Sequence, residues 1–290
     1  MLRISFLLAS LLAVSAGYSQ LHTLGIKSYS ELQSFFHYVG KNARIISGHR
    51  GSHIAGYPEN AIETFEHVLK HTPAFFEIDP RLTKDSVIVL LHDATLDRTT
   101  TGKGKLADFT WEEVKKLRLK DSNGKVTPYR IPTLQEAIEW ARGKTVLNLD
   151  KKDVPFAMTA EIIRKNNAGS FVMVTVHNAQ QAKFYYDDDP QRMMSAFVKT
   201  GKAMKEYEAA GVPWKNMIAY IGSENKPGNQ KMFDRLHDKG VMCMISAAPV
   251  YDKLPTVEER AEAYRDIFKQ GADILESDLP VEVAEAVHRL

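Results

Sequence analysis

Short apolar runs alternate with helix-period segments from residue 43 to the end of the chain. The apolar runs are rich in β-branched residues and predict strands at 44–47, 75–79, 146–150, 171–176, 193–198, 217–221, 241–246 and 273–277. Between them, apolar residues at helical spacing predict helices that include 61–70, 133–142, 156–165, 229–239 and 258–270. Eight strands, each followed by a helix, over roughly 250 residues are typical of a closed parallel (β/α)8 TIM barrel.

A doubly wound open sheet shares this alternation and is the competing architecture. No Gly-x-Gly-x-x-Gly follows any predicted strand, and the chain contains no Gly-Lys-Ser/Thr phosphate loop. The sequence therefore disfavours the nucleotide-binding forms of the open sheet.

Two segments stand outside the alternation. Ser28 and Glu31 have the spacing of a capping box, and an amphipathic pattern follows at Leu32, Phe35, Phe36 and Val39. We expect this helix to pack across the bottom of the barrel. The stretch 93–132 is too long for a simple loop and contains a predicted short helix at 111–117. It predicts a small insertion over one barrel mouth, within a single domain that spans 20–290.

The first residues have the order of a secretory signal peptide. One positive residue, Arg3, precedes an apolar run at 4–14 and the small residues Ser15, Ala16 and Gly17. The run is shorter than the ~20 residues that a membrane span needs. We therefore predict a signal peptide at 1–19, a secreted or periplasmic mature chain, and no stable membrane insertion.

Composition narrows the class of protein. The chain has 290 residues, of which 44% are hydrophobic, as expected for a folded globular protein. Lys and Arg number 38 against 36 Asp and Glu, so the charge offers no general attraction for nucleic acid, and we expect no nucleic-acid partner. The single cysteine, Cys243, excludes an intramolecular disulfide and a cysteine-built zinc site, and we interpret it as a core residue. The sequence does not indicate an oligomeric state.

Ionisable residues gather where the predicted strands end, which in a TIM barrel is the functional face. These positions hold His49, Arg50, Glu77, Asp79, Asp150, Lys152, His177 and Asp278. Glu77 and Asp79 are two residues apart on a strand, so their side chains share a face and repel unless a cation lies between them. Oxygen ligands favour calcium or magnesium. The alternative is that one carboxylate faces solvent while the other pairs with a basic residue.

Two histidines are placed to meet these carboxylates. A turn at Lys84 and Asp85 would fold the run 87–91 back on the preceding strand and return His92 to about the level of Glu77, where it can act as acid or base. His49 and Arg50 lie on a glycine-flanked turn that lets an anion approach the backbone, and arginine offers a fork for phosphate oxygens. The remaining histidines are interpreted as surface or core residues: His22, His37, His53, His67, His71, His237 and His288.

These residues fall into a pattern of motifs. His49-Arg50-Gly51 precedes Pro58-Glu59-Asn60, Glu77-x-Asp79 follows, and then come His92-Asp93 and Leu96-x-Arg98-Thr99-Thr100. In order and spacing the chain resembles the glycerophosphodiester phosphodiesterases, from Ile45 to Pro280. The resemblance implies a phosphodiesterase-type TIM barrel with a small insertion after the second strand.

The resemblance also implies roles for single residues. One divalent cation, calcium or magnesium, would be held by Glu77, Asp79 and a third carboxylate, Asp150. His49 and His92 would be the catalytic acid–base pair, and Arg50 and Lys152 would contact the substrate phosphate. The implied substrate is a small glycerophosphodiester, cleaved to glycerol 3-phosphate and an alcohol.

Three departures from the family pattern limit this reading. Asp150 stands where glutamate is usual, and the alternative is that it pairs with Lys151 or Lys152 and binds no metal. Pro80 follows the carboxylate pair and predicts an early end of the strand. The run at 241–249 lacks the tryptophan and asparagine common in the seventh strand of the family, so we expect a different wall in the head-group pocket.

Two other functions stay open. A sphingomyelinase D-like lipid phosphodiesterase uses a similar barrel and histidine pair, but it needs an exposed apolar rim that the sequence does not locate. A non-catalytic phosphoryl-binding barrel needs no acid–base pair, so the presence of both His49 and His92 argues against it.

Overall fold

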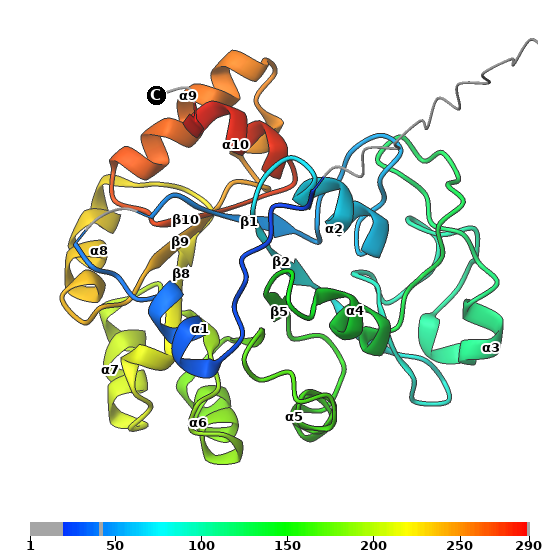
Figure 1. The fold of residues 1–290 in the computed structure, drawn as a ribbon, viewed down its shortest axis with the longest axis horizontal. Coiled ribbons are helices and arrows are strands. Elements are labelled where there is room, and N and C mark those ends of the chain that lie inside the picture. The colour runs from blue at the N-terminus through cyan, green and yellow to red at the C-terminus, as the bar shows by residue number, and fades with distance from the viewer. Residues whose placement is uncertain (1–19, 41–42, 289–290) are drawn as a thin grey trace, which may run out of the picture.

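The computed structural model describes residues 20–40 and 43–288, so the predicted signal peptide at 1–19 lies outside the described residues. Eight parallel strands close into a barrel in the order β1-β10-β9-β8-β7-β6-β5-β2 (Figure 1). These barrel strands are β1 (Ile45–His49), β2 (Phe75–Ile78), β5 (Leu147–Leu149), β6 (Val172–Val176), β7 (Met194–Phe197), β8 (Met217–Gly222), β9 (Cys243–Ser246) and β10 (Ile274–Ser277). Closure confirms the predicted TIM barrel and excludes the doubly wound sheet.

Helices surround the barrel, and each of the eight predicted strands and five predicted helices is present (Figure 1). The α-helices are α1 (Tyr29–Phe35), α2 (Ile62–Leu69), α3 (Trp111–Val114), α4 (Leu134–Ala141), α5 (Phe156–Lys165), α6 (Ala179–Asp188), α7 (Gly201–Ala209), α8 (Gln230–His237), α9 (Val257–Lys269) and α10 (Pro280–His288). Short 3-10 turns lie at η1 (Leu106–Asp108), η2 (Trp214–Asn216), η3 (Pro227–Asn229) and η4 (Tyr251–Lys253). Within the described residues, no helix is long and apolar enough to cross a membrane.

The α1 helix covers the bottom of the barrel, as expected. The Ser28 hydroxyl accepts a hydrogen bond from the Glu31 amide at 3.2 Å and caps the helix. Leu32 and Phe36 are buried in one apolar cluster with residues at or near the start of the barrel strands. The prediction for Val39 is wrong: its side chain is 73% exposed, because α1 ends at Phe35 and the apolar face does not continue.

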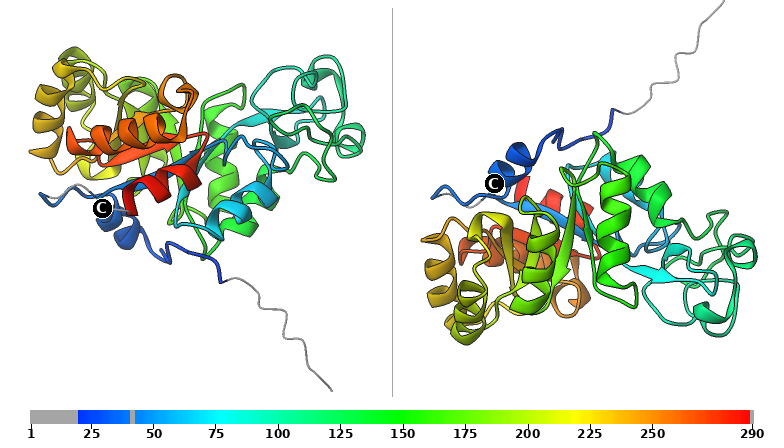
Figure 2. Two further views of the ribbon diagram at one scale, coloured as in Figure 1. Left: turned by 90° about the horizontal axis from the view of Figure 1, so that it is seen from above. Right: turned by 90° about the horizontal axis from the view of Figure 1, so that it is seen from below.

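A hairpin follows β2 and leads into the insertion. Strand β3 (Pro80–Leu82) pairs antiparallel with β4 (Ile88–Leu90), which confirms the predicted turn between the two runs. Strand β2 ends at Ile78, just before Pro80, as that proline predicted. The following residues, 93–132, build a small apolar cluster of their own around Leu96, Leu106, Val114 and Leu119. Figure 2 shows this segment beside the barrel, on the side away from α7 and α8.

Candidate active site

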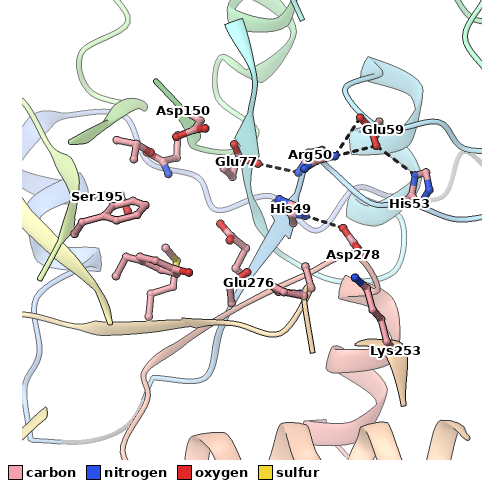
Figure 3. A pocket seen from close by; sticks show the side chains of 18 of the residues that line it. His49, Arg50, His53, Glu59, Glu77, Asp150, Ser195, Lys253, Glu276 and Asp278 are labelled. Atoms are coloured by element: carbon pink, nitrogen blue, oxygen red, sulfur yellow. Dashed lines mark hydrogen bonds and ion pairs between the residues drawn. The ribbon is translucent and has the colours of Figure 1, made fainter. Parts of the chain in front are cut away.

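A cavity of about 570 Å³ opens at the carboxyl ends of the barrel strands. Figure 3 shows that acidic and basic side chains from several elements point into it. Of the predicted site residues, His49, Arg50, Glu77 and Asp150 line it. Asp79 and Lys152 are not among the lining residues and form an ion pair with each other at 3.0 Å. Among the described residues that line the cavity, His92 is absent. The hairpin forms as expected, but the His92 ring pairs with Asp93 and no contact joins it to the three carboxylates among the described residues.

The turn after β1 places Arg50 by its backbone. Arg50 has a φ of +52°, and its amide donates to the Glu77 carboxylate at 3.1 Å. The turn is tight because a Cβ at position 48 would lie 2.3 Å from the Gly51 carbonyl oxygen, and one at 51 would lie 2.5 Å from the Phe65 ring. Gly48 and Gly51 are therefore required because neighbouring atoms leave no room for a Cβ. The tight turn that they allow positions the Arg50 amide that donates to Glu77.

Three carboxylates converge next to this turn. Glu77, Asp79 and Asp150 each offer an oxygen, and these oxygens all lie within 4.8 Å of one another. Burial and the charge of Asp79 raise the pKa of Glu77 well above its usual value. Burial also disfavours the charge on Asp150, but contacts with His177 and Lys152 hold the pKa of Asp150 below its usual range. An all-oxygen set with excess negative charge fits a hard divalent cation.

Lys152 lies between two of these carboxylates. Its ammonium is 2.5 Å from Asp150 and 3.0 Å from Asp79. The pairing of Asp150 with Lys152, considered from the sequence as an alternative to metal binding, is thus present in the structure. It neutralises part of the cluster, and Glu77 remains without a lysine or arginine side chain paired to its carboxylate among the described residues.

Asn60 orients Asp79. Its side-chain amide donates to the Asp79 carboxylate at 2.7 Å, and its carbonyl oxygen accepts from the Asp79 backbone amide at 3.0 Å. Asn60 itself has a φ of +58°, which asparagine tolerates better than most residues. The Pro-Glu-Asn motif therefore fixes one of the candidate ligands from the start of α2.

Each of the two predicted catalytic histidines has a carboxylate on Nδ1. His49 Nδ1 is 2.7 Å from Asp278, and His92 Nδ1 is 2.7 Å from Asp93. Burial opposes the charged form of His49, but the hydrogen bond to Asp278 and the charges of Glu77 and Glu276 raise the pKa of His49 to about 10. In both residues the Nδ1 contact leaves Nε2 for other partners.

Sequence reasoning missed several residues of the cavity. Glu276 lines it and is buried, and burial raises the pKa of its carboxyl group. Glu276 is two residues before Asp278, so the same strand spacing that identified Glu77 and Asp79 would have identified it. Glu59 and Arg98 were recognised as motif residues without a role, and both line the cavity. His53 also lines it, which corrects its interpretation as a surface or core residue.

A second group of ligand-type side chains lies at the opposite end of the barrel. His237, Cys243 and Asp273 offer atoms within 4.8 Å of one another. Asp273 accepts from the Cys243 amide at 2.8 Å and lies 2.8 Å from His237 Nε2. Two donors already share one carboxylate oxygen, so this group is a hydrogen-bonded support for the start of β9.

Comparisons with known proteins agree with the fold and with the motifs. The family model described as "Glycerophosphoryl diester phosphodiesterase family" matches residues 49–207. A crystal structure of a glycerophosphoryl diester phosphodiesterase from Parabacteroides distasonis is 56% identical, covers 93% of this chain and 95% of its own, and has a TM-score of 0.92. The glycerophosphodiester phosphodiesterase of Caldanaerobacter subterraneus subsp. tengcongensis is 41% identical over 104 residues, or 36% of this chain and 42% of that protein.

More distant structures share the fold. A phosphodiesterase from Oleispira antarctica, in complex with the product sn-glycerol-3-phosphate, is 19% identical, covers 85% of this chain and 97% of its own, and has a TM-score of 0.66. The chain matches less than half of the length of the curated relatives. The family match over residues 49–207 and the near full-length likeness to the Parabacteroides structure nevertheless agree. This chain belongs to the glycerophosphoryl diester phosphodiesterase family.

Proposed function

We propose that this protein hydrolyses glycerophosphodiesters to glycerol 3-phosphate and an alcohol. The observation that carries the proposal is a three-carboxylate cluster at a cavity in the barrel mouth that His49, paired with Asp278, also lines. The second histidine–aspartate pair, His92 and Asp93, is connected to this cavity through Arg98. Family membership supports the reaction type. The product named for the Oleispira relative supports the choice of substrate class.

One calcium or magnesium ion is the proposed cofactor, held by Glu77, Asp79 and Asp150. The donor set fits such an ion, since all three ligands are oxygens, and burial together with the neighbouring charge of Asp79 raises the pKa of Glu77. When bound, the ion supplies charge neutralisation and polarises a phosphoryl oxygen.

His49 is the proposed general acid and His92 the proposed general base. Phosphodiester cleavage requires one group to take a proton from the attacking oxygen and another to give a proton to the departing alcohol. The raised pKa of His49 keeps its ring protonated at neutral pH, which suits the acid. His92, with Nδ1 on Asp93 and its ring 34% exposed, has Nε2 left to accept a proton.

Arg50 and Lys152 are the proposed phosphate contacts. The Arg50 guanidinium is held by Glu59 through its Nη1 atom, at 3.2 and 3.3 Å, and its buried Nε has no hydrogen-bond partner among the described residues. Lys152 lies at the carboxylate cluster itself. Arg50 lines the cavity, and Lys152, whose ammonium is paired with Asp79 and Asp150, would reach a phosphate only if a bound cation took over these two carboxylates.

One assay tests the reaction and the cofactor together. The protein is stripped of metal and incubated with a panel of glycerophosphodiesters, and glycerol 3-phosphate is measured before and after calcium or magnesium is added. We expect release only with metal, and weaker metal affinity in Asp150→Ala, with the exposed Asp238→Ala as control.

Activity unaffected by chelation would refute the metal, and no release from any substrate would refute the proposed hydrolysis. Cleavage of intact sphingomyelin instead would support the sphingomyelinase D-like reading, and binding without turnover would support the phosphoryl-binding one.

Secretion is a separate proposal that rests on the sequence of residues 1–19. We expect the mature chain to begin after Ala16 or Ser19 and to be found in the periplasm or the medium. Amino-terminal sequencing of the fractionated protein checks this, and a mature chain that retains Arg3 would contradict it.

A further inference from the structure

Arg98, from the insertion, joins two carboxylates with different partners. Its Nη1 and Nη2 atoms donate to the two Glu59 oxygens at 2.9 and 2.8 Å. Its Nε and Nη2 atoms donate to the two Asp93 oxygens at 2.7 and 3.0 Å. All three guanidinium nitrogens are thereby engaged, and both contacts are bidentate.

Each of these carboxylates in turn holds a residue of the proposed site. Asp93 contacts His92 Nδ1 at 2.7 Å. Glu59 is only 3% exposed, and its two oxygens, which accept from Arg98, also accept from Arg50 Nη1 at 3.3 and 3.2 Å (Figure 3 shows the Glu59–Arg50 contact). His92 and Arg50 are therefore connected through a single side chain that comes from the insertion.

Arg98 lines the cavity, but its side chain is committed mainly to other protein groups. Four of its N–H donors serve two carboxylates, and its charge is offset by Glu59 and Asp93. Arg50 differs, because its Nε atom makes no hydrogen bond among the described residues and lies 3.7 Å from the Asp79 carboxylate. The contacts of Arg98 thus fit a role that acts through its neighbours.

We propose that Arg98 is a positioning residue that fixes the Nδ1 partner of His92 and the orientation of Arg50 by bridging Asp93 and Glu59. The insertion is then a structural part of the active site. The kinetic side of this inference rests on the proposed phosphodiesterase function, while the contact with His92 can be tested without turnover.

Lysine is the informative substitution at this position. It keeps the positive charge, but its single ammonium cannot reproduce two bidentate contacts with fixed geometry. Arg130→Lys is the matched control, since Arg130 is also 43% exposed, belongs to the same insertion and forms a bidentate pair with Glu136, away from the cavity.

The kinetic test compares Arg98→Lys, Arg98→Gln and Arg130→Lys. We expect both Arg98 variants to lose about 10–100-fold in kcat, the usual range for residues that orient active-site ligands. Arg130→Lys should match the wild type. Asp93→Asn should also lower kcat, and the double variant Arg98→Lys/Asp93→Asn should be no worse than the stronger single variant, because Asp93→Asn breaks one of the two contacts that Arg98→Lys already breaks. Additive losses or wild-type kcat in Arg98→Lys would overturn the proposal.

A spectroscopic test separates this inference from the proposed function. Nitrogen-15 NMR of the histidine rings distinguishes the two neutral tautomers, with the His92 signal assigned by its loss in His92→Gln. We expect one tautomer, protonated on Nδ1, in wild type and Arg130→Lys, and a mixture in both Arg98 variants. An unchanged His92 tautomer in folded Arg98→Lys and Arg98→Gln would refute the positioning role, whether or not the wild type hydrolyses any substrate.

Discussion

The two ends of the barrel each contain buried carboxylates and a histidine, yet their charges are balanced differently. At the bottom, Asp273 is fully buried, and one of its oxygens takes both the Cys243 amide and the His237 ring. At the mouth, Glu77, Asp79 and Asp150 crowd together, with Lys152 as their nearest cation. Burial raises the pKa of Glu77 and of Glu276 at this end.

The comparison shows how to separate a stabilising cluster from a functional one. A buried carboxylate that accepts from an amide and contacts a histidine within the fold supports stability, even though the second oxygen of Asp273 has no hydrogen-bond partner among the described residues. A cluster of carboxylates with too few hydrogen-bond or ionic partners lowers stability. Such a cluster is retained where a bound ligand compensates its charge. Substitutions at the mouth should therefore change activity, and those at the bottom should change stability.

The largest effect is expected from the two catalytic histidines. His49→Ala and His92→Ala should each reduce kcat/KM by about 10²–10⁴-fold, the usual contribution of a general acid or base. Thermal unfolding should show that both variants remain folded. His71→Ala, which changes an exposed histidine, should retain full activity. Near-normal turnover in both active-site variants would show that the mouth is not where the chemistry occurs.

Asp278→Asn sharpens the assignment of the acid. Burial disfavours a charged His49, and Asp278 is the main group that overcomes it and raises the pKa of His49 to about 10. A general acid must be protonated, so activity should persist toward pH 10 in the wild type and fall on the alkaline side as His49 loses its proton. Without the Asp278 charge, that alkaline decline should move to lower pH by roughly 1–3 units. A pH–rate profile with an unmoved alkaline limb would remove His49 from the role of acid.

Asp273→Ala tests the opposite end. It removes the acceptor for a buried amide and for His237, so the free energy of unfolding should fall by about 1–3 kcal/mol. Activity per folded molecule should stay the same, because Asp273 lies at the far end of the barrel. Urea unfolding and an assay at low temperature measure the two quantities, with the exposed Asp238→Ala as control. Lost activity in a folded Asp273→Ala protein would break the comparison.

The smallest effect is expected at Cys243. The thiol is fully buried, and burial together with the charge of Asp273 raises its pKa well above the usual value. The protonated, covered thiol should not react with a thiol reagent in the native protein at pH 8, and it should react fully in denaturant. Rapid native labelling would show that the bottom of the barrel is open or that Cys243 is ionised.

The barrel was predictable because each strand carries its own local signal. The apolar β-branched runs at 171–176 and 217–221, for example, contain β6 and β8 almost to the residue. Val39 was misassigned because helical periodicity does not register where a helix ends, and the chain leaves α1 after Phe35. Residue propensity and hydrophobic periodicity therefore predict the presence of a helix or strand more reliably than the residue at which it ends.

The candidate metal ligands could be predicted from the sequence, whereas the residues that position them or line the rest of the cavity were harder to predict. Glu77 and Asp79 follow from strand spacing, whereas Glu276 was missed although the same spacing relates it to Asp278. Arg98 is different, because its partners Glu59 and Asp93 come from separate segments and only the folded chain brings them together. His53 carries no pattern that would separate a cavity residue from a surface one.

The cap at the bottom of the barrel bears on the order of folding. Leu32 and Phe36 pack in one cluster with Phe75, Val146, Met173, Met193, Ile218, Met242 and Ile274, which come from strands along the whole chain. The barrel itself closes by pairing β1 with β10, the first strand with the last. The surface that buries α1 is therefore complete only after the C-terminal strand has joined. Although α1 is among the first elements made, we therefore expect it to dock late, because such non-local closure slows folding and leaves the apolar face of α1 exposed until then.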